Sequence, residues 1–294
     1  MSDILVECSQ NQLRAMLDVL RPLLPSSIQQ YSCISSFLYH FDKICDNRES
    51  LISEGWNLRF YTHRSGNQDN CTLISLTGHK DYIVTCFTLQ ESQEELKECL
   101  LKTNRIEWNL KRMYVVCDEK LFQTVNEIAC QKVPHNWIYL PYDKLIYASK
   151  DTIQALQLNE DSIDDDLHLA ELDAEKHANI VNEYWQYKHD QSLAYIHQCI
   201  AFNGGIGLFR GNEDQPIAWM TANECLAPGF RYTLPSDRRK GYSELVMKAY
   251  LKRLVKIHQS DLYFMVSEHN EASLSLHKKL GFEVVSRINW LEKP

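Results

Sequence analysis

The sequence lacks several features that would assign it at once to a class of protein. None of its apolar runs reaches eighteen residues, so we expect no transmembrane helix and no membrane partner. Its ten cysteines form no Cys-x-x-Cys pair and its eleven histidines show no metal-ligand spacing, which favours buried free thiols and no metal. The run Gly204-Gly205-Ile206-Gly207 is not followed by Lys-Ser or Lys-Thr, which argues against a nucleotide P-loop.

The sequence also lacks an excess of positive charge. Its formal net charge of −8 argues against general nucleic-acid binding. The first residues, Met1 to Glu7, have no basic segment and are too acidic for a mitochondrial presequence. We therefore expect a cytoplasmic protein with no nucleic-acid partner. At 294 residues and 44% apolar composition, the chain suits one large or two ordinary domains.

An acidic stretch suggests where the chain divides. Residues 159–166 contain only one apolar side chain, Ile163, and read as a linker between domains 1–158 and 167–294. Both halves give the same order of expected elements: two helices, three strands, then helix, strand, helix and strand. In the first half these lie at about 9–24, 28–47, 57–63, 71–76, 81–88, 91–103, 113–116, 119–131 and 137–140. In the second they lie at about 173–187, 190–202, 204–210, 216–221, 229–234, 242–258, 262–266, 271–280 and 282–289.

The most informative stretch is the basic turn Arg238-Arg239-Lys240-Gly241-Tyr242-Ser243, which leads from a strand into an amphipathic helix. The first N–H groups of a helix have no intrahelical acceptor, and the helix dipole adds positive potential there. Gly241 lets the backbone approach an anion closely. The turn therefore suits a phosphate, although a solvated basic turn has the same composition.

A second pattern follows at the C-terminus. Asn270 suits the N-cap of a helix over 271–280, Lys278 and Lys279 suit its negative end, and Gly281 suits its C-cap. The order strand, phosphate turn, helix, strand, helix and strand is thereby complete. An asparagine in this place is also an ordinary N-cap.

These patterns resemble the GNAT superfamily of acyl-CoA-dependent N-acyltransferases. Arg238, Gly241 and Ser243 match its phosphate-binding signature, with Ser in the last place instead of Gly or Ala. Asn270 and Leu280-Gly281-Phe282 match its second signature. Within the superfamily, Ile217-Ala218-Trp219 and Thr233-Leu234-Pro235, followed by Arg238 and Gly241, are similar to the glycine N-acyltransferase-like family, so that the motifs cover about residues 204–290.

The resemblance implies an α+β protein, a tandem of two GNAT-like mixed-sheet α/β domains. The N-terminal domain is degenerate, because the turn after its third strand, 88–95, has no glycine and no cation but three carboxylates. We expect it to bind no CoA and to serve as a scaffold. In the second domain, Arg238, Arg239, Lys240, Gly241, Tyr242 and Ser243 are expected to hold the diphosphate and Asn270 to hold the cofactor from the next helix.

The resemblance also implies roles close to the thioester. The backbone of Thr233 and Leu234 is expected to pair with the pantetheine arm, and an N–H near Leu234 to stabilise the oxyanion. His277 occupies the place where many members have a tyrosine as general acid, although a partly buried core histidine fits the same pattern. The family's glutamate base falls on Ala227. Glu224, three residues earlier, serves only if the loop differs; otherwise the base is water, or none is needed because the acceptor amine has a low pKa.

The sequence therefore predicts an N-acyltransferase that moves an acyl group, with acetyl expected, from acetyl-CoA or another acyl-CoA to a small-molecule amine or amino acid. A peptide or protein amine is an alternative acceptor. The other alternative is a catalytically impaired acyl-CoA-binding module that acts through partners. The family resemblance also allows a mitochondrial location, and no pattern indicates the oligomeric state.

Overall fold

The computed structural model describes residues 2–44, 56–66, 69–79, 81–134, 137–140, 142–158 and 164–293. The chain forms two compact units: unit 1 contains residues 1–145, 266–270 and 284–294, and unit 2 contains 146–265 and 271–283. The units thus differ from the predicted domains 1–158 and 167–294, because two C-terminal segments belong to unit 1. Of the predicted linker 159–166, residues 159–163 lie outside the described residues.

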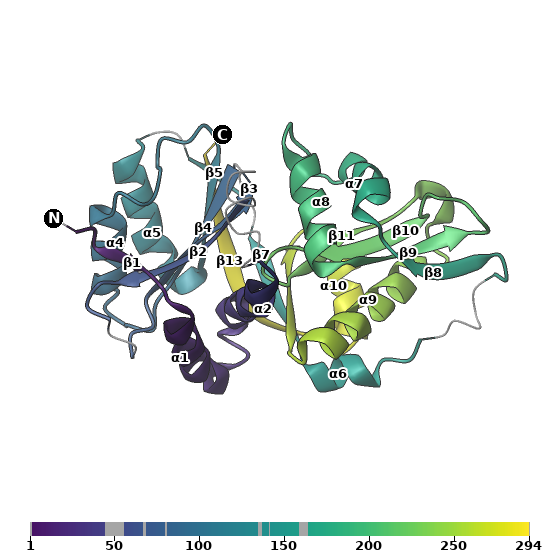
Figure 1. Cartoon of the computed structure of the whole chain (residues 1–294), viewed down its shortest axis with the longest axis horizontal. Coiled ribbons are helices and arrows are strands. Elements are labelled where there is room, and N and C mark those ends of the chain that lie inside the picture. Colours follow the sequence, from purple (N-terminus) through teal and green to yellow (C-terminus); the bar gives the residue numbers. More distant parts are fainter. Residues whose placement is uncertain are drawn as a thin grey trace. The chain divides into compact units, whose positions relative to one another are not determined.

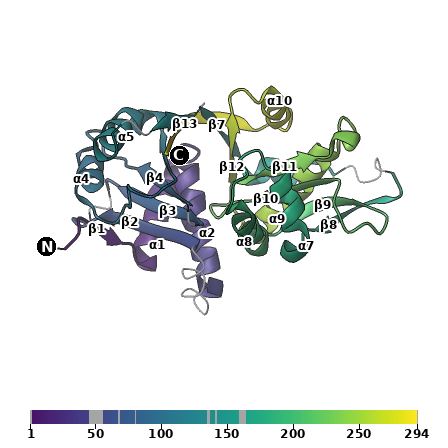
Figure 2. The same ribbon diagram turned by 90° about the horizontal axis from the view of Figure 1, so that it is seen from above.

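Unit 1 is built on a mixed sheet in the order β1-β2-β3-β4-β5-β13, with β6 paired to β13. Its elements are β1 (Leu5–Glu7), α1 (Gln10–Leu20), α2 (Ile28–Ile44), β2 (Trp56–His63), β3 (Leu73–His79), β4 (Asp81–Phe87), α4 (Glu94–Lys102), β5 (Met113–Asp118), α5 (Glu119–Lys132), β6 (Ile138–Tyr139) and β13 (Glu283–Lys293). Strands β4 and β5 are parallel, whereas β1–β2, β2–β3, β3–β4, β5–β13 and β6–β13 are antiparallel. Helices α4 and α5 cover one face of this sheet, and α1 and α2 lie on the other (Figure 2).

The last strand of the chain completes the sheet of unit 1. Residues of β13 pair antiparallel with β5, from Ile288 opposite Asp118 to Lys293 opposite Met113. Lys293 donates from Nζ to the carbonyl oxygens of Trp108 and Leu110 at 2.9 and 2.6 Å. The predicted C-terminal strand therefore exists, but it pairs with a strand from the first half of the sequence.

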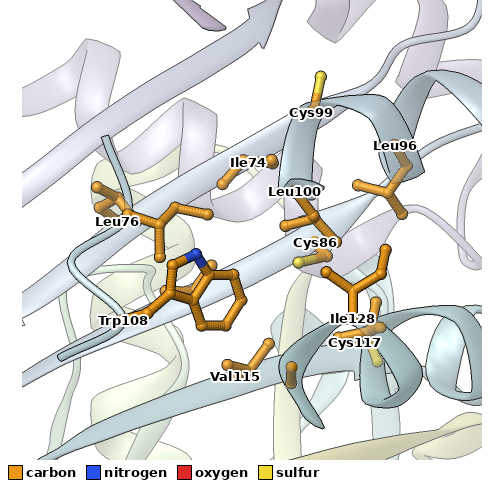
Figure 3. Packing of buried hydrophobic residues seen from close by; sticks show 14 of the residues in the cluster. Ile74, Leu76, Cys86, Leu96, Cys99, Leu100, Trp108, Val115, Cys117 and Ile128 are labelled. Atoms are coloured by element: carbon orange, nitrogen blue, oxygen red, sulfur yellow. The ribbon is translucent and has the colours of Figure 1, made fainter. Parts of the chain in front are cut away.

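The core of unit 1 lies between this sheet and the helices α4 and α5 (Figure 3). Leu96, Cys99 and Leu100 of α4 recur at helical spacing and meet strand residues such as Ile74 and Val115. All five side chains are fully buried. The apolar face of α4 thus fixes the start of this helix against the sheet.

Unit 2 contains a four-stranded antiparallel sheet in the order β11-β10-β9-β8. Its elements are α6 (Lys150–Ala155), β8 (Leu167–Glu171), α7 (Ala174–Glu183), α8 (Ser192–Asn203), β9 (Gly205–Arg210), β10 (Ala218–Ala222), β11 (Pro228–Thr233), α9 (Tyr242–His258), β12 (Leu262–Ser267) and α10 (Glu271–Lys279), together with the second half of β7 (Asp143–Ala148).

Helices cover both faces of the four-stranded sheet (Figure 1). On one face, α7 and α8 enclose an aromatic core with Trp219 at its centre and Phe230, Tyr232 and Leu234 packed against it. On the opposite face, α9 packs on β9, β10 and β11, with its buried residues Leu245, Val246, Tyr250 and Leu254 at helical spacing. Strand β11 therefore packs against a different pair of elements on each face. It ends at Thr233, and a turn leads from there into α9.

The predicted repeat of elements is present. Strands β2, β3 and β4 lead into α4, β5 and α5, as β9, β10 and β11 lead into α9, β12 and α10. Seven cysteines in the described part of the chain are free, and of these Cys71, Cys86, Cys99, Cys117 and Cys199 are buried, as predicted. Cys33 and Cys225 are each disulfide-bonded, which corrects that expectation for these two. None of the helices in the described residues combines the length and apolar character that spanning a bilayer requires.

Candidate functional site

Strand β11 is an edge strand, and its outer side offers backbone groups that the sheet does not use. The N–H of Leu234 donates to the carbonyl oxygen of Ile217 at 2.9 Å, toward β10. In an antiparallel pair, successive residues point their N–H groups to alternate sides. The N–H of Thr233, in the regular part of the pairing, therefore faces the open edge. The N–H of Leu234 is used within the sheet, so the neighbouring Thr233 is the candidate for the oxyanion donor expected near Leu234.

A β-bulge distorts β11 at its middle. The pairing with β10 shifts register between Trp219 opposite Tyr232 and Thr221 opposite Gly229. Phe230, inside this irregularity, has a φ of 48°, which is unusual for a residue other than glycine. Bulges redirect side chains and occur often beside active sites. Here the bulge ends the regular ladder at Tyr232, next to Arg231.

The turn after β11 exposes consecutive backbone N–H groups, as the phosphate motif predicts. Arg239 and Gly241 both have left-handed backbone conformations, with φ of 63° and 83°. Within the described residues, the N–H groups of Gly241, Tyr242 and Ser243 have no acceptor. A Cβ built on Gly241 meets nothing within 4 Å. Alternating conformations of this kind form concave anion sites, and the helix dipole of α9 adds to the effect.

The cations of the turn have different surroundings. Arg238 donates from Nη2 to the Tyr232 hydroxyl at 2.8 Å and from Nε to the Thr233 carbonyl oxygen at 3.2 Å, so it braces the turn against β11. Lys240 lies 3.0 Å from the buried carboxylate of Asp237. Arg239 is exposed and has no side-chain partner among the described residues. Of the predicted phosphate-binding cations, Arg239 thus has the fewest interactions within the described part of the chain.

Tyr242 and Ser243 begin helix α9, where they were predicted. The Tyr242 ring is buried and its hydroxyl donates to Asp164 at 3.3 Å, so this residue anchors the helix start. Burial raises the pKa of Tyr242, with the Asp164 carboxylate adding to the shift. Ser243 is partly exposed. The anchor keeps the open N–H groups at the surface in a fixed position.

Asn270 immediately precedes α10, as the second motif predicts. Its side chain is exposed, and its N–H donates to the Ser267 carbonyl oxygen at 2.9 Å. At the other end, Gly281 has a φ of 79° and the Phe282 N–H donates to the His277 carbonyl oxygen at 3.0 Å, which is the predicted glycine C-cap. The two ends of α10 therefore follow the local sequence signals.

His277 lies in the core side of α10, not at the surface. It is 3% exposed, and its ring makes an edge contact with Phe264 at 4.5 Å between centroids. Burial lowers the pKa of His277 to about 4, although its Nδ1 lies 2.7 Å from the Ser273 carbonyl oxygen. The ring is therefore neutral at pH 7, with the proton on Nδ1 and a lone pair on Nε2. A neutral histidine in this state is poorly suited to protonate a thiolate.

Glu224 lies at the position from which the sequence allowed a base. It is 4% exposed, and its Oε2 accepts from the Tyr195 hydroxyl at 2.7 Å. The turn that follows it is closed by the Asn223 side chain, whose Oδ1 accepts from the N–H groups of Cys225 and Ala227. This short turn places a buried carboxylate just before β11, while Ala227 brings no titratable group.

The corresponding turn of unit 1 contains an internal carboxylate instead of an open anion site. Glu95 in the first turn of α4 is 8% exposed and accepts from Ser65, Asn70 and Thr72 at 2.8–2.9 Å. Burial alone would raise the pKa of Glu95, but these hydrogen bonds and nearby His63 outweigh it and lower the pKa. The sequence showed the carboxylates of this turn, but not that one of them is buried.

Comparison with known proteins agrees with the two-part organisation. A family model described as "FR47-like protein" matches residues 205–291, and one described as "Domain of unknown function (DUF5645)" matches residues 4–128. The human protein "Glycine N-acyltransferase-like protein 2" is 25% identical over 294 residues, with 96% of this chain and 95% of that protein covered. The match thus includes both halves of the sequence.

Solved structures show the same fold. A Drosophila protein has a TM-score of 0.89 at 22% identity, and the likeness covers 100% of this chain and 99% of that one. A tandem GNAT protein from the clavulanic acid biosynthesis pathway has a TM-score of 0.55 at 11% identity, with 98% and 97% covered. The fold is therefore a tandem of GNAT-like mixed α/β domains, as the sequence predicts.

Proposed function

Because the chain belongs to the GNAT superfamily and is related to the glycine N-acyltransferase-like proteins, we propose that it transfers an acyl group from acyl-CoA to the primary amine of a small acceptor. One observation supports this more than any other. The edge of β11 and the start of α9 offer consecutive backbone N–H groups that no residue in the described part of the chain accepts from.

The diphosphate of CoA is assigned to the turn Arg238–Ser243. The N–H groups of Gly241, Tyr242 and Ser243 donate to its oxygens, and Arg239 adds the cation that is free to move toward it. The pantetheine arm pairs with the outer edge of β11 at Thr233. Asn270, which precedes α10, is assigned to the cofactor on the strength of the family motif alone.

The chemistry proceeds by direct attack. The neutral amine forms a C–N bond to the thioester carbon, the carbonyl oxygen takes the negative charge, and the C–S bond then breaks to release CoA thiolate. The amine loses one proton, and the thiolate gains one. The N–H of Thr233, which faces the open edge of β11, stabilises the oxyanion. Glu224, buried just before β11, is the carboxylate best placed to take the amine proton.

A second candidate function is favoured by the state of His277. Its pKa of about 4 leaves almost no protonated form at neutral pH, so the predicted proton donor for the thiolate is missing if His277 acts alone. A protein that binds acyl-CoA and turns over very slowly, and that acts through partners, fits the same geometry. A peptide or protein amine is compatible as the acceptor in place of a small molecule.

The test separates binding from turnover. CoA and acetyl-CoA are titrated into the full chain by calorimetry, and free thiol release from acetyl-CoA is then followed with a mixed pool of amines and amino acids. We expect saturable binding and amine-dependent thiol release. Binding without release supports the acyl-CoA-binding module, whereas the absence of binding overturns both candidates. His277→Phe with unchanged turnover excludes His277 as the proton donor.

A further inference from the structure

Arg231 in β11 is a cation without a carboxylate partner in the described part of the chain. Its Nη2 donates to the Ser273 hydroxyl at 3.0 Å, and its Nη1 lies 3.1 Å from the Met247 sulfur. A guanidinium has five N–H donors, and a thioether is a weak acceptor. Burial lowers the pKa of Arg231 to about 10, which still leaves the group charged at neutral pH. Most of its hydrogen-bonding capacity and all of its charge are therefore unmatched.

Two other arginines of unit 2 each have a carboxylate partner. Arg210 pairs with the buried carboxylate of Asp237 at 3.1 Å, and Arg253 pairs with Glu171 at 2.9 Å. A partly buried cation with no counter-ion costs stability, because the protein interior solvates charge less well than water does. Such an arrangement is expected where an anion from outside the chain supplies the missing charge.

The position of Arg231 relates it to the proposed transfer centre. Its side chain points to the α9 and α10 face, away from Phe230 and Tyr232. Thr233 lies two residues along the strand and shares this face. Its Oγ1 is buried and has no hydrogen-bond partner among the described residues, and the same holds for His277 Nε2.

We propose that Arg231 binds a carboxylate of a substrate beside the reacting thioester, with the Thr233 hydroxyl as a second donor. Arg231 is then a specificity-determining residue, and this inference rests on the proposed acyl transfer at the edge of β11. Carboxylate is the chemistry that a guanidinium recognises best through paired N–H bonds. The carboxylate comes from the far end of the acyl chain or from an amino-acid acceptor.

Two matched pairs of substrates separate these sources. Succinyl-CoA and butyryl-CoA have acyl chains of equal length and differ by a terminal carboxylate. Glycine and glycinamide present the same amine and differ in the same way. The binding of each thioester to the full chain is measured by calorimetry, and the two acceptors are compared by thiol release from acetyl-CoA. All measurements are repeated with Arg231→Met, Arg231→Lys and, as a matched exposed control, Arg14→Met.

We expect the wild-type protein to prefer the carboxylate member of one pair by about tenfold or more. Arg231→Met should abolish this preference, Arg231→Lys should retain part of it, and Arg14→Met should leave it intact. The affected pair identifies the source of the carboxylate. The inference is overturned if the wild-type protein shows no preference for the carboxylate member of either pair. It is also overturned if a preference survives in Arg231→Met. Failure to bind any CoA thioester overturns the proposed function as well.

The thermal stability of the ligand-free protein gives an independent readout. Removing an uncompensated cation while keeping side-chain volume should raise the melting temperature of Arg231→Met by about 2 °C or more. A purely structural arginine gives the opposite sign, because its loss removes hydrogen bonds without relieving a charge. A lower melting temperature for Arg231→Met together with unchanged substrate preference therefore assigns Arg231 to the fold alone.

Discussion

The turns that precede helices α4 and α9 occupy the same place in the repeated order of elements. The first contains a buried carboxylate of the chain itself, and the second leaves its N–H groups open to an anion. At α4, the N–H of Glu95 donates to the Gln90 side chain at 2.8 Å, and the Glu95 carboxylate itself is buried among hydroxyl and amide donors. At α9, the N–H groups of Gly241, Tyr242 and Ser243 have no acceptor in the described residues. One turn is closed by the chain's own groups, and the other is open to a ligand.

The backbone of the two turns is nevertheless alike. Gln93, which precedes α4, has a φ of 57°, and Gly241, which precedes α9, has a φ of 83°. A left-handed residue at this point is unfavourable for glutamine and easy for glycine. The comparison indicates that the backbone shape is kept in both units, whereas the capacity to hold an anion depends on side chains. The dependence of anion binding on side chains can therefore be tested by substitutions at matched positions of the two turns.

The largest effect is expected from a β-branched side chain at the open turn. Gly241→Val should reduce CoA affinity by at least about 1000-fold, roughly 4 kcal/mol, because the side chain fills the approach to the N–H groups. Gln93→Val at the matched position of α4 should leave CoA affinity unchanged. Calorimetry of both variants tests the contrast, and loss of binding in Gln93→Val contradicts the assignment of the ligand to unit 2.

Acid should destabilise the protein through His277. Its folded pKa of about 4 lies below the ordinary value, so the unfolded chain binds the additional proton first. Stability is full above about pH 6.5 and falls as the pH drops toward 4, by roughly 3 kcal/mol from this group. His277→Phe should flatten this part of the curve in denaturant titrations at several pH values. An unchanged slope contradicts the neutral, buried state of His277.

Glu95 should contribute stability through its charge. Because its pKa is lowered on folding, its contribution is present above the unfolded pKa and is lost as the pH falls through the folded pKa. Glu95→Gln should cost about 2 kcal/mol at pH 7, since it weakens charge-assisted hydrogen bonds from Ser65, Asn70 and Thr72. CoA affinity should not change. A gain in stability would show that the buried carboxylate is a burden on the unit.

The smallest effect compares two glycines. Gly241 and Gly211 both have positive φ, and a Cβ on either meets nothing within 4 Å. Alanine should therefore cost each position a similar amount of stability, about 1 kcal/mol. Only Gly241→Ala should also weaken CoA binding. Equal CoA affinity for the two variants indicates that the backbone at Gly241 does not approach the ligand.

The structural features that depend on local sequence could be predicted. The N-cap position of Asn270, the C-cap at Gly281 and the basic turn before α9 are properties of a few neighbouring residues. The GNAT-like tandem followed from their order along the chain. The buried thiols also followed from composition, except at Cys33 and Cys225, which are disulfide-bonded.

The structural features that depend on pairing between distant segments could not be predicted. Nothing in the sequence of β13 names β5 as its partner, so its place in unit 1 appears only in the fold. The oxyanion donor expected near Leu234 could not be narrowed to one residue, because strand register decides which N–H faces outward and the bulge at Phe230 is invisible in the pattern. The unmatched charge of Arg231 likewise depends on which side chains surround it.

Hydrogen exchange with and without CoA measures the central claim most directly, because it reports on individual backbone N–H groups. We predict that CoA slows hydrogen exchange at Gly241, Tyr242 and Ser243 and along the outer edge of β11. The exchange rates in the turn before α4 should not change. Exchange at the start of α9 that is unaffected by saturating CoA, or protection at the start of α4 instead, would contradict this prediction.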